Sequence, residues 1–481
     1  MADQKRKLLV PAGWWQAALL VVLFGFTVLG ILAYLTYTDE PPIPTAVVDP
    51  AGNILFAGVD IGRGQDVFLR NGLMEYGSIF GHGGYLGPDY TADYLHRAAL
   101  VVQRIYGGPH SDRANSRTIE DFRTNRYDAR AGRLEFTEAQ AVAFRQMFAH
   151  YTGYFDEPTT KYGLRPKAIT DASDLHALTA FFAWAAWAAS AQRPGETYSY
   201  TNNWPSEPLV ANHPTADSLV WSALSLIVLL GGSGVLFAAF GRWNFLGWHG
   251  KEKQQLTFRP PNAVRLTEGQ RACAWFFLVM ALLFLLQTLV GAASQHYRAD
   301  LATFFGIDLA RIFPYNITRT WHVQLAILWV ATAFLAAGIF LAPIIAGREP
   351  RGQRPLIYAL LIALTVVVAG SLAGEFAGMH GWVRHSWSWL GNQGFTYLDL
   401  GRLWQILLVI ALFFWAVILY RGLRGRLRSE HAGNLPWVFF YSALSIPAFY
   451  AVGLLVAPHA NFTQNDFWRF WVVHLWVEDF L

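Results

Sequence analysis

Long apolar runs recur through this chain, and they constrain its fold more than any other feature. A helix needs roughly 20 apolar residues to cross about 30 Å of hydrocarbon, because it rises about 1.5 Å per residue. Seven runs of this kind lie at residues 14–36, 217–240, 272–294, 320–345, 355–374, 400–420 and 436–457. An eighth begins near Phe467 and is still apolar at Leu481. We therefore expect an all-α polytopic membrane protein whose helix bundle is incomplete at residue 481, so that the chain is an amino-terminal portion.

Charge is scarce and unevenly placed. The chain is 54% hydrophobic and only 15% charged, and its formal net charge of +4 could suggest a nucleic-acid partner. The basic residues instead gather in alternate loops, at Lys5, Arg6, Lys7, Arg242, Lys251, Lys253, Arg259, Arg265, Arg271, Arg348, Arg351, Arg354, Arg421, Arg424, Arg426 and Arg428. This positive-inside pattern indicates a protein embedded in the lipid of a bacterial inner membrane with a cytoplasmic amino terminus, and it argues against nucleic-acid binding.

One sizeable polar block interrupts the apolar runs. The sequence therefore predicts three parts: a membrane anchor helix at 1–36, a periplasmic domain at 37–216, and the start of a transmembrane helix bundle at 217–481. Within the block we expect short strands at 45–48 and 53–56 and helices at 60–76, 91–106 and 137–151. The apolar segment 173–191 is flanked by Asp171, Asp174 and Arg193, so we interpret it as a core helix of this domain.

Cysteine usage excludes thiol redox chemistry, and glycine usage argues against an ATP-driven machine. Cys273 is the only cysteine, so the chain has no Cys-x-x-Cys-His motif for a covalent haem c and no disulfide of its own. The glycines at 231–234 lie inside an apolar run and indicate close helix packing rather than a nucleotide site.

Titratable side chains inside hydrocarbon are functional candidates, because burying them costs several kcal/mol. His322 lies about one turn into an apolar run, where it could hydrogen-bond a carbonyl or serve as an axial haem ligand. His474 and Glu478 are four residues apart and would share one helix face. Nitrogen and carboxylate together suit non-haem iron, although a buried His–Glu pair has the same spacing.

Four motifs decide between these alternatives. They are Asn316-Ile-Thr-Arg-Thr-Trp-His322, Phe467-Trp-Arg-Phe-Trp-Val-Val-His474-Leu-Trp-Val-Glu478, Tyr397-Leu-Asp-Leu-Gly-Arg-Leu-Trp-Gln405 and Gly83-Gly-Tyr-Leu-Gly-Pro-Asp-Tyr-Thr-Ala-Asp93. With them the chain resembles the quinol-dependent nitric oxide reductases, relatives of the haem-copper oxidases, in which His-x-x-x-Glu stands where ordinary oxidases have His-x-x-x-Tyr. The resemblance covers essentially the whole chain.

The resemblance implies a fold, a reaction and cofactors. The fold would be a haem-copper-oxidase-like bundle with a cytochrome-c-like domain that lacks haem c. The reaction would be reduction of nitric oxide to nitrous oxide, with ubiquinol or menaquinol as electron donor. His322 would be an axial ligand of a low-spin haem b, and His474 and Glu478 would be catalytic ligands of a non-haem iron facing a high-spin haem b. The remaining ligands would lie in a carboxyl-terminal half outside residues 1–481, so this portion alone is expected to be inactive.

A quinol site requires a group near the outer face that accepts protons as electrons leave. His296 and Asp300 are four residues apart just past the third apolar run and fit this role, although a solvated loop pair has the same pattern. Glu375, His380 and His385 are weaker candidates, for proton entry or haem-propionate contact, and are expected in an outer loop.

The sequence does not decide whether the protein binds calcium. The family tends to bind calcium between haem propionates and the extramembrane domain, and the loop with Tyr85 resembles the part that reaches that site. Phe395-Thr-Tyr-Leu398 stands where relatives usually have Trp-Glu-Tyr-Leu, which removes the carboxylate expected to bind calcium.

Two other functions compete with nitric oxide reduction. A nitric oxide dismutase is a relative that accepts no quinol electrons, but altered His296 or Glu478 would have favoured it, and both are intact. In a membrane scaffold or transporter, polar residues within the membrane would line a transport route. Here the polar residues within the membrane instead collect at two positions that resemble metal-ligand sites. The oligomeric state stays open, with a homodimer as one option.

Overall fold

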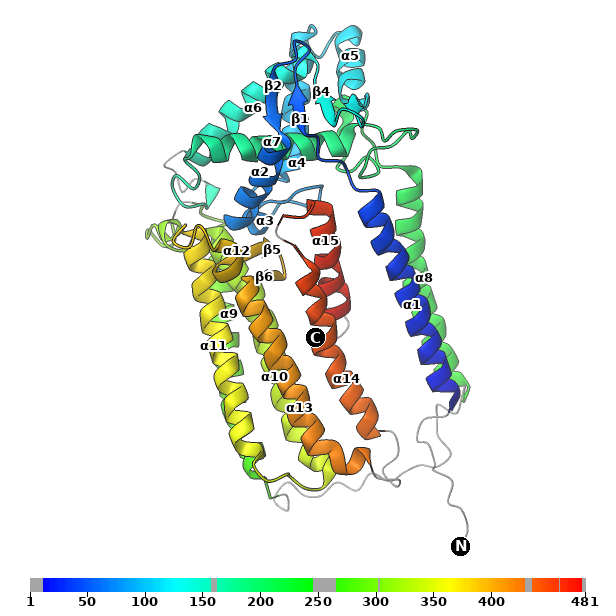
Figure 1. The fold of residues 1–481 in the computed structure, drawn as a ribbon, viewed down its shortest axis with the longest axis vertical. Coiled ribbons are helices and arrows are strands. Elements are labelled where there is room, and N and C mark those ends of the chain that lie inside the picture. Colours follow the sequence, from blue (N-terminus) through cyan, green and yellow to red (C-terminus); the bar gives the residue numbers. More distant parts are fainter. Residues whose placement is uncertain are drawn as a thin grey trace.

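The computed structural model describes residues 12–156, 162–244, 265–301, 303–428, 435–457 and 459–477. Long helices run side by side through most of its length, and a smaller body caps one end of them (Figure 1). We call residues 39–215 the head. The end of the helices that faces the head is called the head side.

Seven described helical stretches are long and apolar enough to cross a membrane, which confirms the seven predicted spans. The helices are α1 (Ala12–Thr38), α8 (Ala216–Arg242), α9 (Glu268–His296), α10 (Tyr315–Ala346), α11 (Gln353–Met379), α13 (Arg402–Leu427) and α14 (Leu435–Tyr450), which a 3-10 turn (Ala451–Leu455) prolongs. On the head side, α15 (Phe462–Trp471) leads into a π-helical turn (Val472–Val477).

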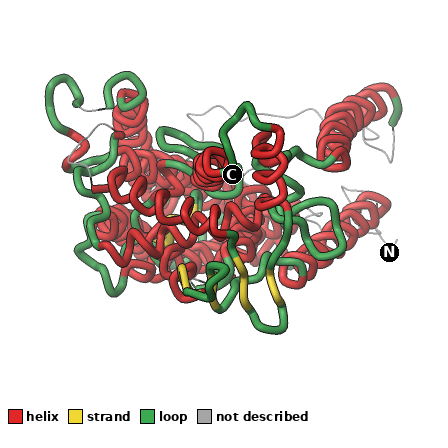
Figure 2. Tube along the Cα trace, turned by 90° about the horizontal axis from the view of Figure 1, so that it is seen from above, coloured by secondary structure: helices red, strands yellow, loops and turns green. Residues whose placement is uncertain are grey.

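The spans divide into a packed group and a loose pair. Helices α9, α10, α11 and α13 pack against one another, and Gly338 of α10 lets the Trp415 ring of α13 approach so closely that a Cβ there would lie 2.7 Å from it. Helix α8 buries none of its residues, and α1 is likewise exposed along its apolar window. Both stand apart from the packed group (Figures 1 and 2).

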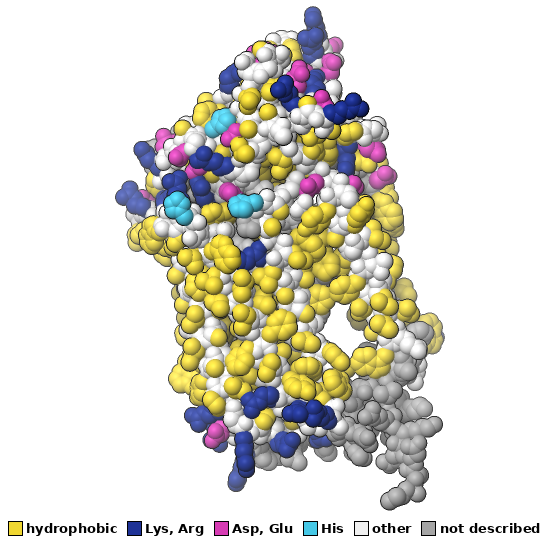
Figure 3. Space-filling view, viewed as in Figure 1, with side chains coloured by type: hydrophobic (Ala, Val, Ile, Leu, Met, Phe, Trp, Pro, Cys, Tyr) yellow, Lys and Arg dark blue, Asp and Glu magenta, His cyan; other side chains and the backbone are white. Residues whose placement is uncertain are grey.

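Charge separates the two ends of the helices. Among the described residues, arginine side chains gather at the end away from the head, below a broad apolar belt (Figure 3). They include Arg348, Arg354, Arg421 and Arg424 from the described loops and helix ends. This distribution is the one expected for a protein whose far end faces the cytoplasm.

In its described residues the head combines a small sheet with six α-helices. The sheet has the order β2-β1-β4-β3, from β1 (Ala46–Val48), β2 (Ile54–Ala57), β3 (Tyr127–Asp128) and β4 (Arg133–Glu135); β1 runs antiparallel to β2 and parallel to β4. The helices are α2 (Gly58–Arg70), α3 (Leu73–Tyr76), α4 (Tyr90–Ile105), α5 (Asp112–Arg123), α6 (Glu138–Asp156) and α7 (Ala172–Ser190).

Helix α7 is the core of the head, which confirms the interpretation of the apolar segment 173–191. From Asp174 to Ser190 all but one of its residues are buried, and it packs against α2, α4 and α6. Alanine on most faces lets these neighbours approach closely. Asp171 caps its amino terminus by accepting hydrogen bonds from the backbone N–H groups of Ser173 and Asp174.

One prediction about the head was wrong, and one helix was not predicted. The expected helix at 60–76 is two helices, because Gly72 adopts a left-handed conformation with φ of 61° and breaks the chain direction between α2 and α3. Helix α5 was not predicted at all. It buries Ala114, Thr118, Asp121 and Phe122 on one face, and because two of these four are polar, an apolar pattern does not mark the helix.

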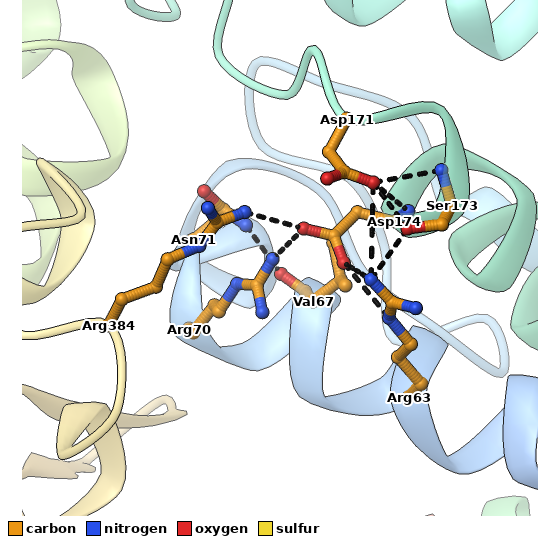
Figure 4. A network of polar contacts seen from close by, with 8 residues as sticks. All are labelled: Arg63, Val67, Arg70, Asn71, Asp171, Ser173, Asp174 and Arg384. Carbon is orange, nitrogen blue, oxygen red and sulfur yellow. Dashed lines mark hydrogen bonds and ion pairs between the residues drawn. The ribbon is translucent and has the colours of Figure 1, made fainter.

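An ionic junction joins the head to the helix bundle. The Asp174 carboxylate, only 3% exposed, pairs with Arg63 and Arg70 of α2 and with Arg384 of the segment after α11 (Figure 4). Arg63 Nη2 lies 2.7 Å from Asp174 Oδ1, and Arg384 Nη2 lies 3.1 Å from Asp174 Oδ2. One carboxylate therefore holds cations from both parts of the molecule.

Replacing Asp174 with alanine should loosen the head, because it leaves Arg70 partly buried without its counter-charge. Removing one partner of a buried ion pair typically costs about 3 kcal/mol, which corresponds to a fall of roughly 5–10 °C in unfolding temperature for a domain of this size. Thermal unfolding of the purified protein measures this shift. As a control, Asp39→Asn removes only an exposed 3.9 Å contact with Arg193 and should change little. Equal shifts in the two variants would contradict a role for Asp174 as the junction.

Candidate functional site

His322 is held in a defined orientation between α10 and α9. Its imidazole is partly buried, and Nδ1 lies 3.0 Å from the backbone carbonyl oxygen of Gln287 in α9. A proton on Nδ1 is donated to that carbonyl, so Nε2 keeps its lone pair and accepts a long, 3.4 Å hydrogen bond from the Gln287 side-chain amide nitrogen. Haem-ligating histidines use this arrangement, because the hydrogen bond fixes both the tautomer and the ring orientation.

Gly291 makes room for the His322 ring. A Cβ at position 291 would lie 2.6 Å from ring atoms Cε1 and Nδ1 of His322. This distance is well inside van der Waals contact, so a side chain larger than hydrogen would move the imidazole. The geometry on α9 is therefore matched to the position of His322 and fits an axial haem ligand.

His296 and Asp300 are brought together at the end of α9. His296 Nε2 donates to the Thr303 carbonyl oxygen at 3.1 Å, while Asp300 accepts from the Thr303 N–H at 3.1 Å and from the Thr303 hydroxyl at 2.7 Å. The rings of Phe304 and Phe305 lie 4.6 and 5.1 Å from the His296 ring, centroid to centroid.

The surface around this pair is apolar and open. Phe305 is 82% exposed, and Ile307 and Ile312 are also exposed. A titratable pair beside exposed aromatic and aliphatic side chains at the end of a membrane helix can receive an aromatic headgroup that carries a long apolar tail.

His474 lies in the π-helical turn after α15, not in a regular α-helix as predicted. Its ring is partly buried, with its centroid 3.8 Å from that of Phe470. Single π-helical turns are rare and are frequent at functional sites. Glu478 lies outside the described residues. Within the described ranges, no group of three His, Cys, Asp or Glu residues could hold a metal ion.

Tyr85 contacts an arginine rather than a carboxylate. The Arg319 guanidinium carbon lies 3.5 Å from the centroid of the Tyr85 ring, and Arg319 Nε lies 3.1 Å from Oε2 of Glu75. Glu75 comes from α3 of the head and is fully buried. Burial raises the pKa of Glu75. A cation from α10 and an acid from the head therefore meet beside Tyr85. This is the place where the sequence did not decide whether calcium binds.

Further buried acids surround this contact. Glu375 belongs to α11 and is 0% exposed, so its expected place in an outer loop is wrong. Asp399 is also fully buried and accepts a 2.8 Å hydrogen bond from Gln324. Both carboxylate oxygens of Glu375 and one oxygen of Asp399 have no hydrogen-bond partner among the described residues. Such orphan oxygens are expected where bound water or the polar groups of a cofactor complete the network.

The sequence did not identify Arg319, Glu75 or Gly291 as site residues. Arg319 had a signal, because it is a charged residue near the start of an apolar run and precedes His322 by three positions. Glu75 and Gly291 had none, since their roles depend on which helix packs against α10.

Comparisons with known proteins cover most of the chain. The family model of the cytochrome c-like domain of the nitric oxide reductase B subunit matches residues 44–206, and the model "Cytochrome C and Quinol oxidase polypeptide I" matches residues 271–481. The chain is also 25% identical over 215 residues to the nitric oxide reductase B subunit of Stutzerimonas stutzeri. That match covers 44% of this chain and 42% of the relative, which is less than half of either protein.

Proposed function

Because the chain belongs to the haem-copper oxidase superfamily and is of the nitric oxide reductase B-subunit type, we propose that it forms part of a quinol-dependent nitric oxide reductase. Two nitric oxide molecules, two electrons and two protons give one nitrous oxide and one water. One quinol supplies both electrons and both protons. The family assignment supports an oxidoreductase of the membrane. We propose in addition that quinol is its electron donor, nitric oxide its substrate and a haem b with non-haem iron its metal centre.

The orientation of His322 is the observation that carries this proposal. Its Nδ1 donates a hydrogen bond to the Gln287 carbonyl oxygen, and Gly291 of α9 leaves space for the ring. We assign Nε2 of His322 to the iron of a low-spin haem b, which would pass single electrons to the reaction centre. His474 and Glu478 are the residues that would hold the non-haem iron.

The roles of the other residues follow from their chemistry. His296 and Asp300 would bind the quinol hydroxyl groups and take up their protons as electrons depart. The exposed Phe305 and Ile307 would contact the quinol ring and tail. Arg319, beside Tyr85 and Glu75, would hold anionic haem propionates through charge-assisted hydrogen bonds at the head side of the bundle. We propose that the head lies on the periplasmic side, which is supported by the arginines at the opposite end of the helices.

Variants of the quinol pair test the donor assignment. His296→Ala and Asp300→Asn should each lower quinol-driven nitric oxide reduction by at least about tenfold, because proton acceptance contributes on that scale or more. Turnover driven by a small artificial reductant should stay within about twofold. Arg298→Gln is the matched control, since Arg298 lies exposed in the same turn. Equal loss with both donors would show that the pair serves the fold rather than quinol.

A further inference from the structure

A polar cleft opens between the head and the helix bundle. Its volume is about 260 Å³, and residues of both parts line it. The head contributes Arg70 at the end of α2 together with Arg165, residues 167–171 and Asp174, and the bundle contributes His380, Arg384 and Trp387. A water molecule takes about 30 Å³ in the liquid, so the cleft has room for a ligand larger than a few waters.

Positive charge in this cleft exceeds negative charge. Arg70, Arg165, Lys167 and Arg384 line it, against the carboxylates of Asp171 and Asp174. Arg63 further neutralises both carboxylates from outside the cleft, at 3.9 Å from Asp171 and 2.7 Å from Asp174. The lining therefore carries two positive charges that no carboxylate in the cleft balances.

The excess charge is located at Arg165 and Lys167. Arg165 Nη1 donates to the His380 carbonyl oxygen at 3.2 Å, and within the described ranges neither side chain forms an ion pair with a carboxylate. Burial lowers the pKa of Arg165, the direction expected for a cation held without a counter-ion. A cationic cleft of this kind favours an anion, and an arginine presents a planar set of donors suited to phosphate.

The cleft lies at the level of a membrane surface. It adjoins the carboxyl end of α11, where the ring centroids of His380 and Trp382 are 5.5 Å apart. Trp382 is 71% exposed and Trp389 is 53% exposed. Exposed tryptophans at the end of a membrane helix are typical of the headgroup region of the bilayer.

We propose that this cleft binds the phosphate headgroup of an anionic phospholipid from the head-side leaflet. Arg165 and Lys167 contact the phosphate from the head, and Arg384 contacts it from the bundle. The acyl chains lie against the apolar belt beside Trp382 and Trp389. Because the ligand bridges the two parts next to Asp174, its binding stabilises the docking of the head on the membrane helices.

Thermal unfolding of the purified protein with short-chain lipids tests this proposal. The probes are dioctanoyl phosphatidylglycerol, dioctanoyl phosphatidylcholine and inorganic phosphate, at matched ionic strength. Phosphatidylglycerol should raise the unfolding temperature most. In Arg165→Gln/Lys167→Gln its apparent dissociation constant should rise at least tenfold. The control Arg130→Gln/Arg133→Gln removes the same charge from exposed residues of the head and should respond as the unaltered protein does.

Three outcomes would overturn the proposal. Equal responses of the two double variants to phosphatidylglycerol would remove Arg165 and Lys167 from the site. Equal shifts with phosphatidylglycerol and phosphatidylcholine would exclude recognition of net negative charge. An equal shift with inorganic phosphate would assign the cleft to a free anion instead of a lipid. Retention of the elution volume of the unaltered protein shows that the Arg165→Gln/Lys167→Gln variant is folded.

Discussion

Replacing His322 with alanine in the full-length enzyme should abolish the optical bands of the low-spin haem b. In the proposed site α10 would supply His322 as the axial ligand, and the hydrogen bond from Nδ1 to the Gln287 carbonyl leaves Nε2 as the nitrogen that could bind iron. Without this nitrogen the iron loses its low-spin state, and electron transfer from quinol should fall by at least about a hundredfold. Absorbance spectra of the reduced protein and haem content per chain measure the effect.

Two further variants distinguish ligation from a general loss of fold. Gly291→Ala keeps the ligand but brings a methyl group to 2.6 Å from the His322 ring, so it should shift the low-spin bands or lower the haem content. His110→Ala removes an exposed imidazole of the head and should leave the bands unchanged. Low-spin bands that survive His322→Ala intact would disprove the assignment.

Replacing Glu478 with alanine should remove the non-haem iron and nearly all nitric oxide reduction. Glu478 follows the π-helical turn by one position in an apolar segment, where an unpaired charge costs several kcal/mol and a metal cation removes that cost. Hard oxygen ligation also favours iron over copper. Elemental analysis of iron per haem, together with the rate of nitric oxide consumption, measures the loss.

Companion variants separate the role of the carboxylate from that of the helix. Glu478→Asp shortens the side chain by one methylene and should retain part of the iron, while His474→Ala should lose as much iron as Glu478→Ala. All three should keep the low-spin haem bands, because His322 belongs to another helix. An alanine variant with undiminished iron and activity would leave Glu478 as a structural hydrogen-bond partner only.

The spans and the core helix of the head could be predicted from the sequence because their signals are local. Each apolar run is long enough to define a membrane helix by itself, and the charged residues that flank segment 173–191 marked α7 as part of the head. His322 could be singled out for the same reason, as a titratable group within an apolar run.

Other features depend on contacts between distant segments, so no local pattern revealed them. The pairing of Glu75 with Arg319 joins residues that are 244 positions apart, and the junction at Asp174 joins α7 to a loop 210 positions later. The close approach of Gly291 to His322 depends on the packing of α9 against α10. The break at Gly72 was missed because the residues on both sides continue a helical pattern.

The products formed from nitric oxide and quinol test the central claim most directly. Full-length enzyme should be purified in detergent and supplied with nitric oxide and a reduced quinol, with nitric oxide followed by an electrode and nitrous oxide by gas chromatography. We expect one nitrous oxide and one oxidised quinone for every two nitric oxide molecules consumed. Nitric oxide consumption that oxidises no quinol, or no consumption by enzyme that contains its full haem and iron, would contradict the account.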